Sequence, residues 1–166
     1  MNEKQQSITL ERSYDASIDD VWDLWTTKEG IESWWGPEGF AVTVRSLDLR
    51  PSGKLIYAMT AVAEPQIAFM KRAGMPLTTE TGITYTEVSR HQRLAYINHA
   101  DFIPGVAPYD VGTAVEFSPG ANGVRLRLII DRMHDETWTQ RAVMGWESEL
   151  GKLERQLLER KRGQSR

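Results

Sequence analysis

The amino-acid sequence predicts an α+β fold in which a curved antiparallel sheet of about seven strands wraps around one long C-terminal helix. Between His134 and Arg162, apolar residues recur in steps of three and four, as they do along one side of a helix. From Phe40 to Arg132 they mostly alternate with polar residues, as they do in strands. The helix has one apolar stripe and the sheet one apolar face, so each can cover the other.

The predicted C-terminal helix has marked ends and an uneven stripe. Acidic residues follow His134 at the positive end of the helix dipole, and Arg160 to Arg162 lie at the negative end. The stripe begins with Trp138 and Trp146 and continues with leucines. Gly145 within it costs a helix about 1 kcal/mol relative to alanine. It therefore indicates either close packing, which is the more frequent reason, or room for a ligand.

The elements before the sheet are short. Ser7 to Tyr14 alternates as a first strand, and Ser17 then caps a brief helix that runs to about Thr26. A second short helix begins at about Lys28 and is stopped by Gly36-Pro37. The pair forms a bent element that can wedge against a sheet.

Turn residues divide the rest of the chain into strands. Pro51-Ser52-Gly53 and Asn122-Gly123 are typical of tight turns, and the short connections favour antiparallel neighbours. The predicted strands are Phe40 to Leu49, Lys54 to Val62, Ile83 to Ser89, Arg93 to Phe102, Asp110 to Ser118 and Val124 to Arg132.

Residues 63–82 interrupt the alternation. Gln66 to Ala73 can form about two turns of helix. Such an excursion is typical of a lid insertion, although an ordinary capping loop is equally compatible with it. In both cases we expect Phe69, Met70 and Met75 to pack downwards onto the sheet.

Length and composition limit the classes of protein. A chain of 166 residues is one domain, 1–166, whose ordered core we expect from 7 to 162. The net charge of -3 argues against a nucleic-acid partner, and the chain has no cysteine for disulfides or thiolate metal sites. No apolar run can span a membrane, and Met1 to Ser7 lacks the apolar core of a signal peptide, so we expect the cytoplasm.

Motifs for chemistry are sparse. The three histidines lie on a turn, a strand and a helix start without metal-ligand spacing, so no metal site is expected. His99 and Asp101 are two residues apart on one strand and share a face. A carboxylate can orient an imidazole there for acid–base catalysis, which makes these two the candidate catalytic residues. A solvated strand face is the commoner explanation.

Tyr96 and Asn98 share the other face of this strand. If they point inward, Asn98 needs a hydrogen-bond partner, because an unpaired buried amide costs about 1–3 kcal/mol. A polar group of a ligand can supply that partner. A neighbouring Tyr57, Tyr85 or Thr113 is the more frequent solution.

Several of these motifs together resemble a known family. They are Trp34-Trp35-Gly36-Pro37, the turn Asp48-Leu49-Arg50-Pro51-Ser52-Gly53, Thr84-Tyr85-Thr86-Glu87-Val88 followed by Arg93-Leu94, and Gly145-Trp146 with Leu150 and Leu153. Over nearly its whole length the chain resembles homologues of the C-terminal domain of the activator of heat-shock protein 90 ATPase, in the START-like (SRPBCC) superfamily. Ser52-Gly53 stands where the usual pattern has two glycines. The resemblance implies a helix-grip fold with a hydrophobic cavity between sheet and helix.

We therefore expect a non-enzymatic domain that binds a small apolar or aromatic molecule and uses no cofactor. The residues expected to line its cavity are Trp35, Tyr57, Met59, Phe69, Tyr85, Tyr96, Asn98, Val115, Leu128, Trp138, Ala142 and Trp146. One alternative, implied by the resemblance alone, is a partner that stimulates a chaperone ATPase. Another is a cyclase- or hydratase-type enzyme that uses His99 and Asp101, or Tyr96. Both a monomer and a homodimer are compatible with the sequence.

Overall fold

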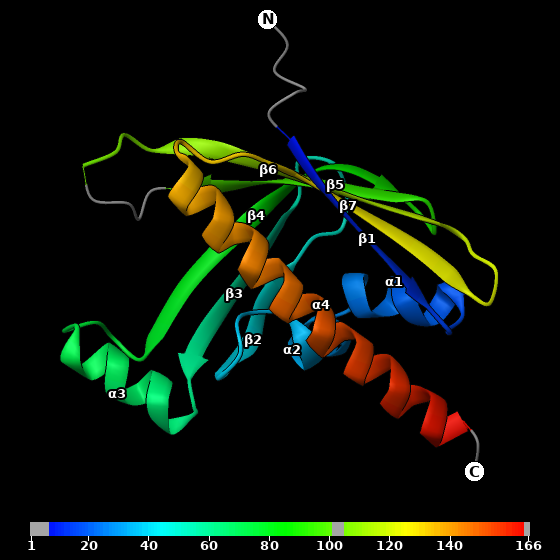
Figure 1. Ribbon diagram of the computed structural model, residues 1–166, viewed down its shortest axis with the longest axis horizontal. Coiled ribbons are helices and arrows are strands. Elements are labelled where there is room, and N and C mark those ends of the chain that lie inside the picture. Colours follow the sequence, from blue (N-terminus) through cyan, green and yellow to red (C-terminus); the bar gives the residue numbers. More distant parts are fainter. Residues whose placement is uncertain (1–6, 101–104, 165–166) are drawn as a thin grey trace, which may run out of the picture.

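The computed structural model describes residues 7–100 and 105–164 and has the predicted order of elements (Figure 1). The elements are β1 (Ser7–Tyr14), α1 (Ile18–Thr26), α2 (Lys28–Trp34), β2 (Phe40–Leu47), β3 (Lys54–Ala61), α3 (Glu64–Arg72), β4 (Thr78–Ser89), β5 (Arg93–Ala100), β6 (Tyr109–Pro119), β7 (Val124–Asp131) and α4 (Glu136–Gln164). The seven strands form one curved sheet, and α4 lies across one face of it.

The sheet is antiparallel throughout, in the order β1-β7-β6-β5-β4-β3-β2. From β2 to β7 each strand pairs with its neighbour in sequence, as the short connections predicted. The additional pair joins β1 to β7, with Ser7 opposite Asp131 and Tyr14 opposite Val124. The α+β prediction, with a sheet wrapped around the last helix, is confirmed.

The predicted start of the fourth strand was wrong. β4 begins at Thr78, not Ile83, and its first residues pair with β3, with Thr78 opposite Thr60 and Thr81 opposite Tyr57. These residues are polar and mostly exposed, so they show no apolar alternation, but threonine suits an extended backbone. Residues 63–82 therefore comprise α3, a turn and the beginning of a strand.

Side-chain caps and one indole fix the bent element formed by α1 and α2. Ser17 Oγ accepts a hydrogen bond from Asp20 N at 3.1 Å, and Thr27 Oγ1 accepts one from Gly30 N at 3.0 Å. The Trp34 indole Nε1 donates to the Leu24 carbonyl oxygen at 2.7 Å, which ties α2 to α1.

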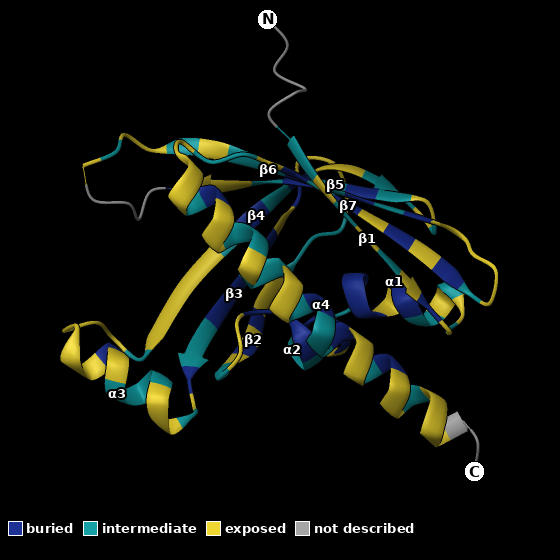
Figure 2. Cartoon of the chain, viewed as in Figure 1, coloured by how far each residue is buried: buried dark blue, intermediate teal, exposed yellow. Residues whose placement is uncertain are grey.

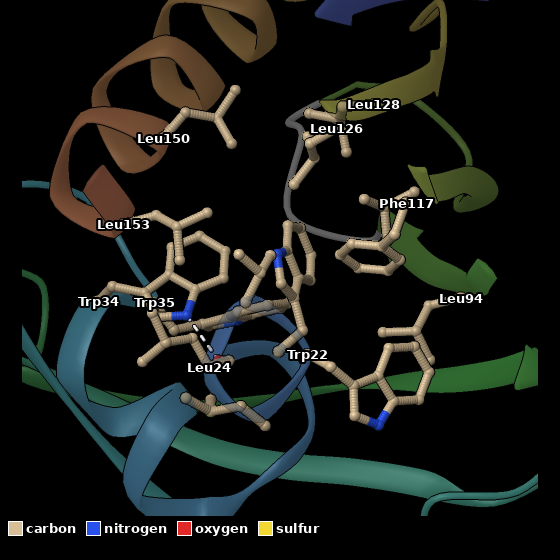
Figure 3. Close-up of a cluster of buried hydrophobic side chains, with 14 of the residues drawn as sticks. Trp22, Leu24, Trp34, Trp35, Leu94, Phe117, Leu126, Leu128, Leu150 and Leu153 are labelled. Carbon is tan, nitrogen blue, oxygen red and sulfur yellow. Dashed lines mark hydrogen bonds between the residues drawn. The ribbon is translucent and has the colours of Figure 1, made fainter. Parts of the chain in front are cut away.

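Much of the hydrophobic core lies where the C-terminal half of α4 meets this bent element (Figure 3). Leu150 and Leu153 point from α4 toward the indoles and Phe117, and both are fully buried. The ring centroids of Trp25 and Trp34 lie 4.7 Å apart. The backbone of α4 is closer to α1 and α2 than to the strands, so large side chains bridge the distance between α4 and the sheet.

α3 departs from the prediction for its apolar residues. Met70 is buried, but Phe69 is 58% exposed and Met75, just after the helix, is 49% exposed. α3 packs mainly against β3 at the end of the sheet, so little of the molecule lies beneath it (Figure 2). None of the described helices is long and apolar enough to cross a membrane.

Candidate functional site

α4 is well buried along its C-terminal half and more exposed along its N-terminal half, which we call the open end. Leu150, in the C-terminal half of α4, is buried, whereas Trp138 and Ala142 in the N-terminal half are only half-buried. A side chain at Gly145 would meet no atom within 4 Å. Gly145 therefore faces open space, and close packing is not the reason for this glycine.

The strands are also exposed at this end. Thr81 is opposite Tyr57 and points to the same side of the sheet, and Asn98 shares its face with Tyr96. Tyr57 and Tyr96 are buried, whereas Thr81 and Asn98 are exposed. Solvent therefore reaches the inner face of the sheet beside a cluster of buried aromatic side chains that includes Tyr57 and Tyr96. We call this cluster the aromatic floor.

Trp35 is the centre of that floor. Its ring centroid lies 6.1 Å from that of Tyr57, 6.2 Å from Tyr96 and 6.3 Å from Trp146. Tyr85 extends the group, 6.4 Å from Tyr96. The end of α2, three neighbouring strands and α4 each contribute one aromatic ring, so residues far apart in sequence meet here.

The Tyr96 hydroxyl is buried and has no hydrogen-bond partner among the described residues. Burial raises the pKa of Tyr96 well above 10, and the nearby charge of Glu149 raises it further. Thr113, opposite Tyr96 on β6, lowers this pKa but does not complete a hydrogen bond. An unpaired buried hydroxyl costs about 1–3 kcal/mol, so its presence requires an explanation.

A carboxyl group also faces the floor. Glu149 of α4 is half-buried, and its Oε1 accepts a hydrogen bond from Gly36 N at 3.2 Å. Lys152 Nζ donates to the Gly36 carbonyl oxygen at 2.9 Å. Burial raises the pKa of Glu149 to about 7, while the hydrogen bond from Gly36 and the charge of Lys152 oppose the rise. Burial likewise lowers the pKa of Lys152.

Sequence reasoning missed Glu149. Glutamate on an amphipathic helix is usually solvated, yet Glu149 follows Ala142 by seven residues and Trp146 by three. This spacing places it at the border of the apolar stripe. The spacing was therefore a usable signal.

The predicted lining residues fall into three groups. Trp35, Tyr57, Tyr85, Tyr96 and Trp146 meet in the floor, while Met59, Asn98, Trp138 and Ala142 lie toward the open end. Val115 and Leu128 are fully buried in the core. Phe69 lies apart on α3.

His99 lies on the opposite face of β5. It is exposed, and its Nδ1 lies 3.0 Å from Asp110 Oδ1 on the neighbouring strand. The pair borders a surface hollow of about 500 Å³ on the outer face of the sheet, so His99 does not reach the inner floor. Asp101, its predicted companion, lies outside the described residues. Across the described parts of the chain, no group of three histidine, aspartate or glutamate residues can hold a metal ion.

A curved antiparallel sheet that grips a long C-terminal helix, with aromatic and polar groups on its inner face, defines a helix-grip domain of the START-like (SRPBCC) superfamily. The family model described as "Activator of Hsp90 ATPase homolog 1-like protein" matches residues 15–158. The chain therefore belongs to this family, as the sequence motifs predicted.

Solved structures show the same fold. A protein from Chromobacterium violaceum is 23% identical with a TM-score of 0.74, over 92% of this chain and 97% of that one. An AHSA1-like protein from Aeromonas hydrophila is 21% identical with a TM-score of 0.68, over 90% of each chain. A protein from Nitrosomonas europaea is 18% identical with a TM-score of 0.70, over 96% of this chain and 98% of that one. Comparison with curated proteins finds no match.

Proposed function

We propose that this protein binds a small apolar or aromatic molecule between the N-terminal half of α4 and the inner face of the sheet. Family membership supports a ligand-binding or co-chaperone-like domain. The observation that favours a ligand is the exposure of Thr81 and Asn98 on the same face as a buried aromatic floor whose Tyr96 hydroxyl lacks a partner among the described residues.

In this proposal Trp35, Tyr57 and Trp146 supply the contact surface. Aromatic rings bury a large area and lose few rotamers on binding, so they hold an apolar guest efficiently. The rings already contact one another, so the guest lies above the floor, between Met59 and Ala142, and not within the indole cluster. We propose binding without chemical conversion, in the cytoplasm.

Ligand screening tests this proposal. Native mass spectrometry and thermal-shift measurements with neutral lipids and aromatic metabolites are expected to yield a ligand that raises the melting temperature and changes tryptophan emission, because Trp35 and Trp146 lie at the floor. If no compound of either class binds, the proposal is wrong.

A co-chaperone-like role is the second candidate, since the family model is named for an activator of Hsp90 ATPase. Phe69, Met75 and Val62 expose apolar surface around α3 that a protein partner can cover. ATP turnover by the host chaperone, measured with and without this protein, tests that role. Unchanged turnover contradicts it.

A further inference from the structure

Glu149 and Tyr96 carry the polar chemistry that faces the proposed ligand. The Tyr96 hydroxyl has no hydrogen-bond partner in the described parts of the chain and can both donate and accept. Glu149 uses Oε1 for Gly36 N, whereas its Oε2 has no hydrogen-bond partner within residues 7–100 and 105–164. Each residue therefore retains unused hydrogen-bonding capacity. Glu149 bonds Gly36, the residue after Trp35, and the Trp35 ring centroid lies 6.1 Å from that of Tyr57 and 6.2 Å from that of Tyr96, so the carboxyl group lies at the edge of the same aromatic cluster.

The nearby cation, Lys152, is held by the backbone. Its Nζ donates to the Gly36 carbonyl oxygen at 2.9 Å, and its charge only partly opposes the rise in the pKa of Glu149. Among the described residues, the charge of Glu149 also acts on the hydroxyls of Tyr57 and Tyr96. Above the pKa of about 7, a ligand carboxylate would meet a mostly ionised Glu149 and two neutral phenols.

We propose that the ligand presents an uncharged hydroxyl group, of an alcohol or a phenol, to Glu149 and Tyr96, and that Glu149 excludes carboxylates. A hydroxyl can donate its proton to Glu149 Oε2 while its oxygen accepts from Tyr96. An ether or ketone can only accept, and a carboxylate can only accept and adds a like charge. This inference rests on the proposed ligand-binding function and specifies the chemical class of the ligand.

The test compares three probes of nearly equal size at pH 8, above the pKa of about 7 that burial gives Glu149. They are 2-naphthol, 2-methoxynaphthalene and 2-naphthoate, and calorimetry gives each dissociation constant. We expect 2-naphthol to bind about tenfold more tightly than the ether, because one donated hydrogen bond is lost. We expect it to bind about a hundredfold more tightly than the carboxylate, because like charges then meet in a half-buried site.

Two conservative variants assign the effect to residues. In Glu149→Gln we expect naphthoate to bind about tenfold more tightly than in the unmodified protein, because the like charge is gone. In Tyr96→Phe we expect both naphthol and the ether to bind more weakly while the preference for naphthol remains, because both ligand oxygens lose the same donor. The matched control is Glu147→Gln, two residues away on the exposed side of α4, which should change no affinity. Circular dichroism and thermal melting verify that each variant folds.

The outcomes separate the two claims. Equal affinities for the three probes, or an unchanged naphthoate affinity in Glu149→Gln, overturn the hydroxyl inference but leave the binding function standing. Binding of none of these probes, together with a failed ligand screen, contradicts both.

Discussion

Glu149 accepts a hydrogen bond from Gly36 N at 3.2 Å and thereby joins the middle of α4 to the end of α2. Lys152, one turn later, bonds the carbonyl oxygen of the same glycine. Gly36 has a φ of +87°, a conformation that favours glycine, so the chain turns sharply where α4 holds it. The two hydrogen bonds that Glu149 and Lys152 make with Gly36 form a clip beside the proposed ligand site. Because both side chains are ionisable, pH and substitution can test what the clip contributes to stability.

The first prediction concerns the pH dependence of stability. Burial raises the pKa of Glu149 from 4.5 to about 7, so between these values the folded state holds a proton that the unfolded state releases. The free energy of unfolding therefore falls as pH rises through this window, by up to roughly 3 kcal/mol from this group. Urea unfolding of the unmodified protein and Glu149→Gln at pH 5 and pH 8 measures it. Compared with the unmodified protein, Glu149→Gln should be more stable at pH 8 than at pH 5. If the difference in the free energy of unfolding between the two proteins does not change with pH, the raised pKa of Glu149 is contradicted.

The second prediction concerns Lys152. Lys152→Met keeps much of the side-chain length but removes the hydrogen bond to the Gly36 carbonyl oxygen. We expect a loss of about 1–2 kcal/mol in the free energy of unfolding, because the carbonyl group is part-buried. Lys71→Met on the exposed surface of α3 is the control and should change stability by less than about 0.5 kcal/mol. Equal effects of the two substitutions would show that the hydrogen bond from Lys152 to Gly36 does not contribute to the free energy of unfolding.

The third prediction tests the packing of the C-terminal half of α4. Leu153 is fully buried, whereas Leu158 on the same helix is 51% exposed. Leu153→Ala should destabilise by about 2–5 kcal/mol through lost burial and the cavity it leaves. Leu158→Ala should cost less than about 1 kcal/mol. Thermal and denaturant unfolding compare them, and similar losses would mean that α4 does not pack as described.

The fourth prediction concerns a turn. Ser52 has a φ of +73°, in the left-handed region that side chains disfavour, and its N–H donates to the Tyr85 carbonyl oxygen at 2.8 Å. Ser52→Gly retains this hydrogen bond and removes the strain, so we expect a gain of about 0.5–1 kcal/mol. Ser46→Gly, in β2, should instead destabilise, because glycine weakens a strand. A loss of stability in Ser52→Gly would contradict the predicted strain.

Much of the fold could be predicted because periodicity and turn residues report it locally. The stripe of α4 and the alternation in β7 are visible in sequence, and both are confirmed. The start of β4 was not predictable in this way, since Thr78 to Thr81 are polar and owe their conformation to pairing with β3. The exposure of Phe69 depends on where α3 lies relative to the sheet, which sequence does not encode locally.

The candidate site was only partly predictable for a related reason. Aromatic residues on inward positions identified Trp35, Tyr57 and Tyr96, because apolar patterning fixes which side they face. Glu149 escaped notice because its charge suggested the solvent side. The contact of His99 with Asp110 depends on the register of β5 and β6, which residue spacing within one strand cannot supply.

The central claim, that a ligand occupies the open space beside α4, is tested most directly by two glycine substitutions. A Cβ atom added at Gly145 or at Gly151 would meet no atom within 4 Å, so both positions accept a side chain, and leucine raises helix propensity. Gly145 lies on the side of α4 that carries Trp138 and Glu149, and Gly151 lies on the other flank.

Calorimetric titration of the ligand found in the screen should show at least about tenfold weaker binding to Gly145→Leu, because the new side chain occupies space that the ligand needs. Binding to Gly151→Leu should be unchanged. Equal affinity of both variants and the unmodified protein would contradict the proposed site.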